Sequence, residues 1–136
     1  MTTLALIALL FVAPPRTVFP GGSIQASEGC IAPPRIKMLI DAFLGTVECP
    51  KQRLSIAVFG GAMIGPACSS EQQRLTLHSS NGRPLVMCAT ERRGVGDGRL
   101  IRELVVDLGP GQLSAVVRSP QDVLLVLQLA ASYEPD

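Results

Sequence analysis

The alternation of apolar and polar residues predicts strands over much of the second half of the chain. Residues 53–58 (RLSIAV) place Leu, Ile and Val on one side, the pattern of a strand with one buried face. Two further runs, 74–78 and 83–90, flank Asn81-Gly82. This pair is the strongest short hairpin signal in the chain, because both central residues of a type I′ turn need positive φ.

A second hairpin is predicted towards the C-terminus. Residues 100–108 and 112–118 form apolar strand patterns on either side of a Gly-Pro-Gly turn at 109–111. Between the two hairpins, residues 91–99 (ERRGVGDGR) have the composition of a charged, glycine-rich surface loop.

A short helix is predicted at residues 35–44. Its apolar residues fall at helical spacing, it follows Pro34, and it ends near Gly45. The apolar residues that define this face are Ile36, Leu39, Ile40, Phe43 and Leu44.

The segment 120–132 permits two interpretations. Its nearly continuous Val/Leu run favours a buried strand, whereas Ser119-Pro120-Gln121-Asp122 resembles the capped beginning of a helix. With the strand, the fold class is mainly β, a small antiparallel β-sandwich with one short helix near residues 35–44. With the helix, it is α+β with a C-terminal helix at 120–132.

Composition narrows the class of protein. The chain has 136 residues, of which 47% are hydrophobic and 17% charged, and its mean hydropathy is +0.35, which excludes intrinsic disorder. The formal net charge is +1, without a basic stripe, so binding to nucleic acid is not expected. Aromatic residues make up only 4%, which leaves few stacking platforms and favours a protein partner.

The N-terminal region predicts export. Residues 4–13 are an apolar run too short to span a bilayer but of the length found in signal peptides. With a cleavage site at Ala26, residues 1–26 form a leader, and residues 27–136 form a single β-rich domain without a stable membrane span. The alternative is that residues 4–13 are a buried element of the fold.

The cysteines point to the same compartment. Cys30, Cys49, Cys68 and Cys88 lie 19 or 20 residues apart, without the C-x-x-C spacing of zinc or redox sites. They are predicted to form two disulfides, in one of three possible pairings, which indicates a secreted or periplasmic protein. The alternative is four free thiols in a cytoplasmic protein.

Residues 53–129 resemble the bacterial pre-peptidase C-terminal domain, a small secreted β-sandwich attached to exported enzymes. The similar stretches are RLTLHSSNGRPLV and VVDLGPGQLSAVV. Gln112-Leu113 stands where that family usually has an aromatic residue after the turn glycine. The resemblance implies an extracellular accessory domain without catalytic residues.

Catalytic and cofactor motifs are not found in the sequence, and we predict neither a metal nor a cofactor. His78 is the only histidine; with Ser79 or Ser80 and with Asp97 or Asp107 it would give the residue types of a hydrolytic triad. Since neighbouring positions on a strand face opposite ways, His78 and Ser79 are not expected to meet.

A cluster of arginines around the glycine-rich loop is the candidate binding site. If the two hairpin ends converge, these side chains form a cationic patch for an acidic surface of a partner. Its members are Arg83, Arg92, Arg93, Arg99 and Arg102.

The favoured hypothesis is therefore an exported, disulfide-stabilised β-sandwich that acts as a non-catalytic binding or accessory module. One alternative is a cytosolic α+β interaction or chaperone-like subunit with free thiols. A second alternative is a small hydrolase that uses His78.

Overall fold

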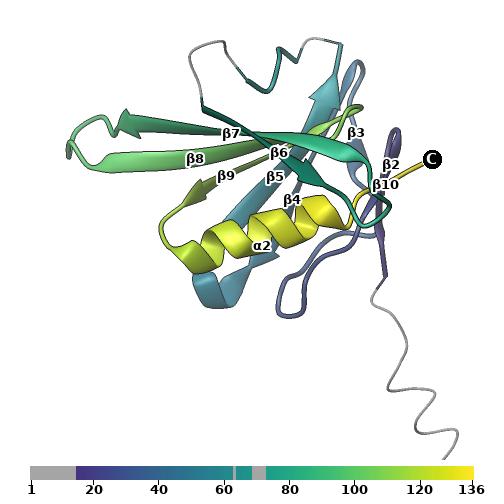
Figure 1. The fold of residues 1–136 in the computed structure, drawn as a ribbon. Coiled ribbons are helices and arrows are strands. Elements are labelled where there is room, and N and C mark those ends of the chain that lie inside the picture. The colour runs from purple at the N-terminus through teal and green to yellow at the C-terminus, as the bar shows by residue number, and fades with distance from the viewer. Residues whose placement is uncertain (1–14, 63, 69–72) are drawn as a thin grey trace, which may run out of the picture.

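The computed structural model describes residues 15–62, 64–68 and 73–136, and these residues form two β-sheets and one α-helix. The small sheet has the order β1-β2-β10, and the large antiparallel sheet has the order β3-β4-β5-β9-β8-β7-β6 (Figure 1). The mainly β class is confirmed. The apolar run 4–13 lies outside the described residues.

The elements have the following bounds. The small sheet contains β1 (Thr17–Phe19), β2 (Gly22–Ile24) and β10 (Glu134–Pro135). The large sheet contains β3 (Lys37–Met38), β4 (Ala42–Cys49), β5 (Leu54–Gly61), β6 (Gln73–His78), β7 (Pro84–Arg93), β8 (Leu100–Asp107) and β9 (Gln112–Val117). A 3₁₀ turn, η1 (Pro50–Gln52), joins β4 to β5, and the helix is α2 (Pro120–Ala131).

Both predicted hairpins are present, but the first turn is not of type I′. His78 pairs with Pro84, so the loop has five residues, and only Gly82 of the Asn-Gly pair has positive φ, at 83°. The amide of Arg83 donates to the side-chain oxygens of Ser79 and Asn81, at 3.1 and 3.2 Å. Because these side chains satisfy the loop, Asn81 needs no left-handed conformation. The loop after β7 is also shorter than predicted, since β7 continues to Arg93.

The predicted helix at 35–44 is wrong. The segment contains β3 and the beginning of β4, and β4 pairs with β5 along its whole length. Phe43 and Val47 are buried in the alternating pattern of a strand, whereas Leu39 and Ile40 are exposed. The helical spacing of apolar residues was thus coincidental, because pairing with a distant strand determines this segment.

The C-terminal segment is the helix of the alternative interpretation, and the favoured strand is wrong. The hydroxyl of Ser119 accepts a hydrogen bond from the amide of Asp122 at 3.2 Å, and Pro120 occupies the first turn. The buried Asp122 carboxylate accepts from the amide of Arg118 at 2.9 Å. These caps begin the helix, and Leu125, Val126 and Leu129 then form its buried side.

Three aromatic rings join the small sheet, the large sheet and the end of the helix. Phe19 stacks on Phe43 with a centroid distance of 5.6 Å and on Tyr133 at 5.9 Å. All three side chains are buried. Gly60 makes room for this junction, because a Cβ atom there would lie 2.6 Å from the Phe43 ring.

Residues 16–25 are tied to the C-terminal end of the chain. Strand β2 pairs with β10, the amide of Gln25 donates to the Ser132 hydroxyl at 2.8 Å, and the amide of Asp136 donates to the Gly21 carbonyl at 3.2 Å. The described part of the predicted leader therefore packs within the fold. The boundary at Ala26 remains a prediction.

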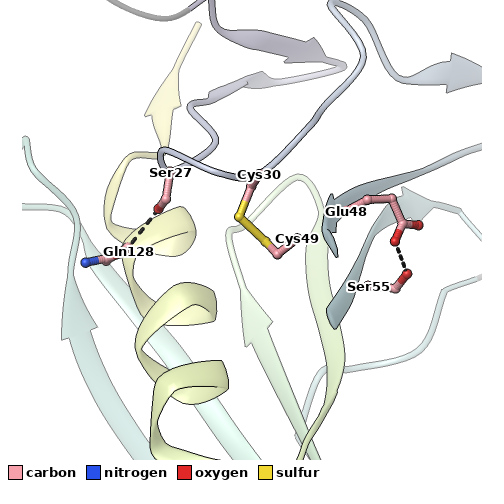
Figure 2. The surroundings of a disulfide bond; sticks show 6 residues. All are labelled: Ser27, Cys30, Glu48, Cys49, Ser55 and Gln128. Atoms are coloured by element: carbon pink, nitrogen blue, oxygen red, sulfur yellow. Dashed lines mark hydrogen bonds between the residues drawn. A yellow bond between two sulfur atoms is a disulfide. The ribbon is translucent and has the colours of Figure 1, made fainter. Parts of the chain in front are cut away.

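Two disulfides are present, Cys30–Cys49 and Cys68–Cys88, and the described residues contain no free cysteine. The prediction of two disulfides is confirmed, and the four free thiols of the alternative are not found. Figure 2 shows the first bond, which joins the segment after β2 to the last residue of β4. Beside it, Ile31 and Glu48 exchange two backbone hydrogen bonds of 2.7 and 2.8 Å.

The aromatic junction predicts unequal effects at neighbouring positions of β1. Phe19 is 2% exposed and Val18 is 42% exposed. Phe19→Ala should lower the free energy of unfolding by about 3–5 kcal/mol, as expected when a buried Phe is truncated. Val18→Ala is the matched control and should change it by about 0.5 kcal/mol or less. Denaturant titration measures both, and equal losses would contradict the assignment of Phe19 to the core.

Candidate functional site

A large cavity lies between β8, the end of β9 and the beginning of α2. We call it the wedge. Its volume is about 580 Å³, within the range of roughly 300–1,000 Å³ typical of ligand pockets. Its walls are formed by Leu100, Arg102, Val117, Arg118, Ser119, Pro120 and Val123.

The wedge exists because the β7–β8 hairpin extends beyond the first residues of the helix (Figure 1). Arg102 pairs with Val117, so both side chains lie on the sheet face that carries α2. Further along β8, Leu104 and Val106 are buried on this face. Leu100, two residues before Arg102, is 54% exposed. The apolar surface therefore continues past the helix without cover.

The helix side of the wedge is held by its caps and by Arg118. The guanidinium of Arg118 donates to the carbonyl of Arg53 at 2.6 Å, at the corner between η1 and β5. Together with the bond from the Arg118 amide to Asp122, this contact fixes the short connection from β9 to α2. The wall is thus preformed, but the charge of Arg118 is engaged elsewhere.

Arg102 is the cation that the wedge offers to a ligand. Its Nε donates to Oε1 of Glu91 at 2.8 Å, and both side chains are more than half exposed. Exposed ion pairs of this kind contribute about 0–1 kcal/mol. A carboxylate brought by a ligand can therefore replace Glu91 at little cost.

The structure brings four of the five predicted arginines to one end of the β7–β8 hairpin, but on different faces. Arg92 pairs with Ile101 and Arg93 with Leu100, so they face opposite ways, and only Arg93 shares the face of the wedge. Arg93 donates to the carbonyl of Gly98 at 3.0 Å, and Arg99 lies 3.9 Å from Asp97.

Carboxylates partly neutralise the positive charge at this end of the hairpin. Residues 91–103 contain four arginines, but Glu91, Asp97 and Glu103 reduce their formal charge to +1. The four arginines therefore form no single cationic face.

Arg83 lies at the opposite end of β7 from the other four. The strand spans ten residues, or about 30 Å at ~3.4 Å per residue. Its guanidinium carbon is 5.9 Å from the centre of the Tyr133 ring. Arg83 thus covers the aromatic junction and does not belong to the wedge.

Ser79, Asp97 and Asp107, three of the residues considered for a hydrolytic triad, each form a hydrogen bond within their own turn or loop. The Ser79 hydroxyl donates to the Asn81 side chain within the turn. The carboxylates of Asp97 and Asp107 accept from backbone amides of their own loops, at 3.0 and 2.8 Å. Within the part of the chain that the structure describes, no group of three or more His, Cys, Asp or Glu side chains is arranged to hold a metal ion.

Sequence reasoning missed most of the wedge because its walls come from three separate segments. Val117, Pro120 and Val123 meet Leu100 only when residues 120–131 are helical and turn back across the sheet. The cap sequence beginning at Ser119 was the signal that would have found this wall.

Comparison of the chain with protein-family models, curated proteins and solved structures yields no match. Among the described residues, no helix is long and apolar enough to cross a membrane.

The burial of Tyr133 generates a prediction about alkaline stability. Burial raises the pKa of Tyr133 above its ordinary value; the nearby Arg83 lowers it and Asp136 raises it further. The folded state thus holds the phenol proton more tightly than the unfolded chain does. The resulting stabilisation is present below about pH 10 and is lost as the pH rises through the folded pKa. Denaturant titrations across this range should show the fall.

Tyr133 is the only tyrosine, so phenolate absorbance reports on it alone. Tyr133→Phe should remove its share of the alkaline fall. It should also cost about 1 kcal/mol at neutral pH, because the bond to the Gly21 carbonyl is lost. An unchanged alkaline slope in this variant would assign the fall to other groups.

Proposed function

We propose that this chain is an exported, non-catalytic binding module that holds a segment of a partner protein in the wedge. The segment has apolar side chains next to a carboxylate. The observation that carries the proposal is the combination of a preformed apolar cavity with one weakly paired arginine at its wall.

The apolar part of the proposal rests on the surface around Leu100. Val117 and Pro120 face the same cavity, and Val123 is only partly buried. Exposed apolar surface with a polar rim is typical of protein interaction sites. Covering such side chains yields about 25 cal/mol for each Å² removed from water, which supplies the main driving force.

The carboxylate part rests on Arg102. Its planar guanidinium can bind a carboxylate with two parallel hydrogen bonds, which adds orientation to the apolar contact. Since the whole chain has a formal charge of +1, attraction at long range is weak, and recognition depends on contact within the cavity.

Export is supported by the two disulfides, because such bonds persist mainly in oxidising compartments. The proposal also agrees with the resemblance of residues 53–129 to the pre-peptidase C-terminal domain, whose role is accessory. We propose the same kind of role here, secreted or periplasmic.

Binding can be tested with two short peptides that differ only in charge. The probes are acetyl-Asp-Leu-Leu-Asp-amide and its Asn-Leu-Leu-Asn counterpart, titrated into the isotope-labelled chain and followed by NMR. The acidic peptide should shift the resonances of Leu100, Val117 and Val123 in a saturable manner, and the neutral peptide should bind more weakly.

Variants distinguish the wedge from a general cationic effect. Arg102→Glu should weaken binding of the acidic peptide by about tenfold or more, which corresponds to 1.4 kcal/mol. Leu100→Asp should abolish it. Arg92→Glu is the matched control, on the opposite face of the same hairpin, and should leave binding unchanged. Equal loss in Arg92→Glu and Arg102→Glu, or no saturable shift at the wedge, would refute the proposal.

The packing of β1 and β2 generates a separate prediction about processing. We expect export to leave the chain from Thr17 onward intact, because Phe19 and Ile24 are buried in the core. The full chain is the reference for this comparison. A chain that begins at Ser27 should lose at least about 5 kcal/mol, the combined lower limit for a buried Phe and a buried Ile. Denaturant titration compares them, and equal stability would favour cleavage at Ala26.

A further inference from the structure

The two edges of the large sheet differ in how far other segments of the chain pair with them. At one edge, β3 pairs with Phe43 and Leu44 of β4, and Ile31 exchanges two hydrogen bonds with Glu48 beside the Cys30–Cys49 disulfide. At the other edge, β6 pairs with β7, and no other strand of the described residues pairs with it. Residues 73–78 contain neither proline nor lysine, two residues that commonly protect an open edge.

The register of the β6–β7 hairpin shows which backbone groups face the open edge. The amide of Ser79 donates to the carbonyl of Arg83 at 2.8 Å, so this pair is of the hydrogen-bonded type. The next pair, His78 and Pro84, is then non-hydrogen-bonded, which suits a proline that has no amide proton to donate.

Hydrogen-bonded and non-hydrogen-bonded pairs alternate along an antiparallel ladder. The backbone N–H and C=O groups of Arg74, Thr76 and His78 therefore point away from β7, towards the open edge.

We infer that a second copy of this chain binds at this edge, with the two β6 strands antiparallel around a two-fold axis at Thr76. In this register Thr76 faces Thr76 of the second copy, and Arg74 faces His78 of the second copy on either side. Each of these pairs exchanges two backbone hydrogen bonds. The contact is self-complementary, as a two-fold interface requires.

The side chains of β6 suit the same register. Leu75 and Leu77 lie on the face that carries α2, in register with Met87 and Leu85. Leu75 is 53% exposed. In the pair, Leu75 lies opposite Leu77 of the second copy, so a continuous apolar strip covers the junction.

The charges of β6 also avoid a conflict in this arrangement. Arg74 is the only arginine or lysine of the strand. It faces His78 and not its own copy, so the two arginines are separated by four residues along the ladder, or ~14 Å. None of the wedge residues takes part in the dimer. An experiment can therefore refute the dimer without refuting peptide binding at the wedge, and the reverse.

Sedimentation of the full oxidised chain over a concentration series tests the inference. We expect a species of twice 14.4 kDa at high concentration. Leu75→Lys should raise the dissociation constant by about tenfold or more, because it places cations beside the two-fold axis and removes apolar contact. Leu100→Lys is the matched control, a leucine of similar exposure on the same face of β8, and should leave it unchanged.

Two variants test the register itself. Thr76→Pro removes a donor that points away from β7, so it should abolish the dimer while the monomer keeps its fold, as checked by circular dichroism. Thr76→Cys should form a disulfide between copies, since hydrogen-bonded partners have Cα atoms about 5.5 Å apart, whereas Arg74→Cys should not. A monomer at all concentrations, or a dimer that survives Leu75→Lys and Thr76→Pro, would overturn the inference.

Discussion

The contact of Phe19 with both Phe43 and Tyr133 is the interaction on which the arrangement of the elements depends. Each ring comes from a different part of the molecule: the small sheet, the edge region of the large sheet, and the residues that follow the helix. Because the chain has only four Phe and one Tyr, placing three of the five rings at one junction concentrates much of its aromatic surface there. The rest of the core is aliphatic, and the disulfides tie its edges.

The position of the wedge follows from this junction. Tyr133 anchors the C-terminal end of α2, and the Ser119 and Asp122 caps fix the other end, so the helix lies on the sheet with a set length. The β7–β8 hairpin is longer than the helix can cover. The apolar surface stays uncovered because α2 is fixed at both ends. Arg102, whose ion pair with Glu91 is exposed, adds one positive charge to this apolar surface.

Local sequence patterns predicted the elements that local residues determine. The hairpins, the strand from Leu54 and the two disulfides were found because turn residues, period-two alternation and cysteine spacing all act over short distances. The helix predicted at residues 35–44 was wrong because pairing with β5 sets the conformation of this segment. The strand favoured for residues 120–131 was wrong because a run of Val and Leu is compatible with both a buried strand and a helix. The wedge was not predicted, since its walls adjoin only after folding, and of the five predicted arginines only Arg102 lines it.

The Cys30–Cys49 bond lies beside the Ile31–Glu48 bridge at the protected edge of the large sheet. Among the described residues, β6 is therefore the edge left without a partner strand, and two-fold association through one edge closes after two copies. A reduced chain in which that bridge opened would offer an edge on each side, and head-to-tail pairing through two edges has no natural end. The Cys30–Cys49 bond thus lies at the edge opposite to the one through which we infer association.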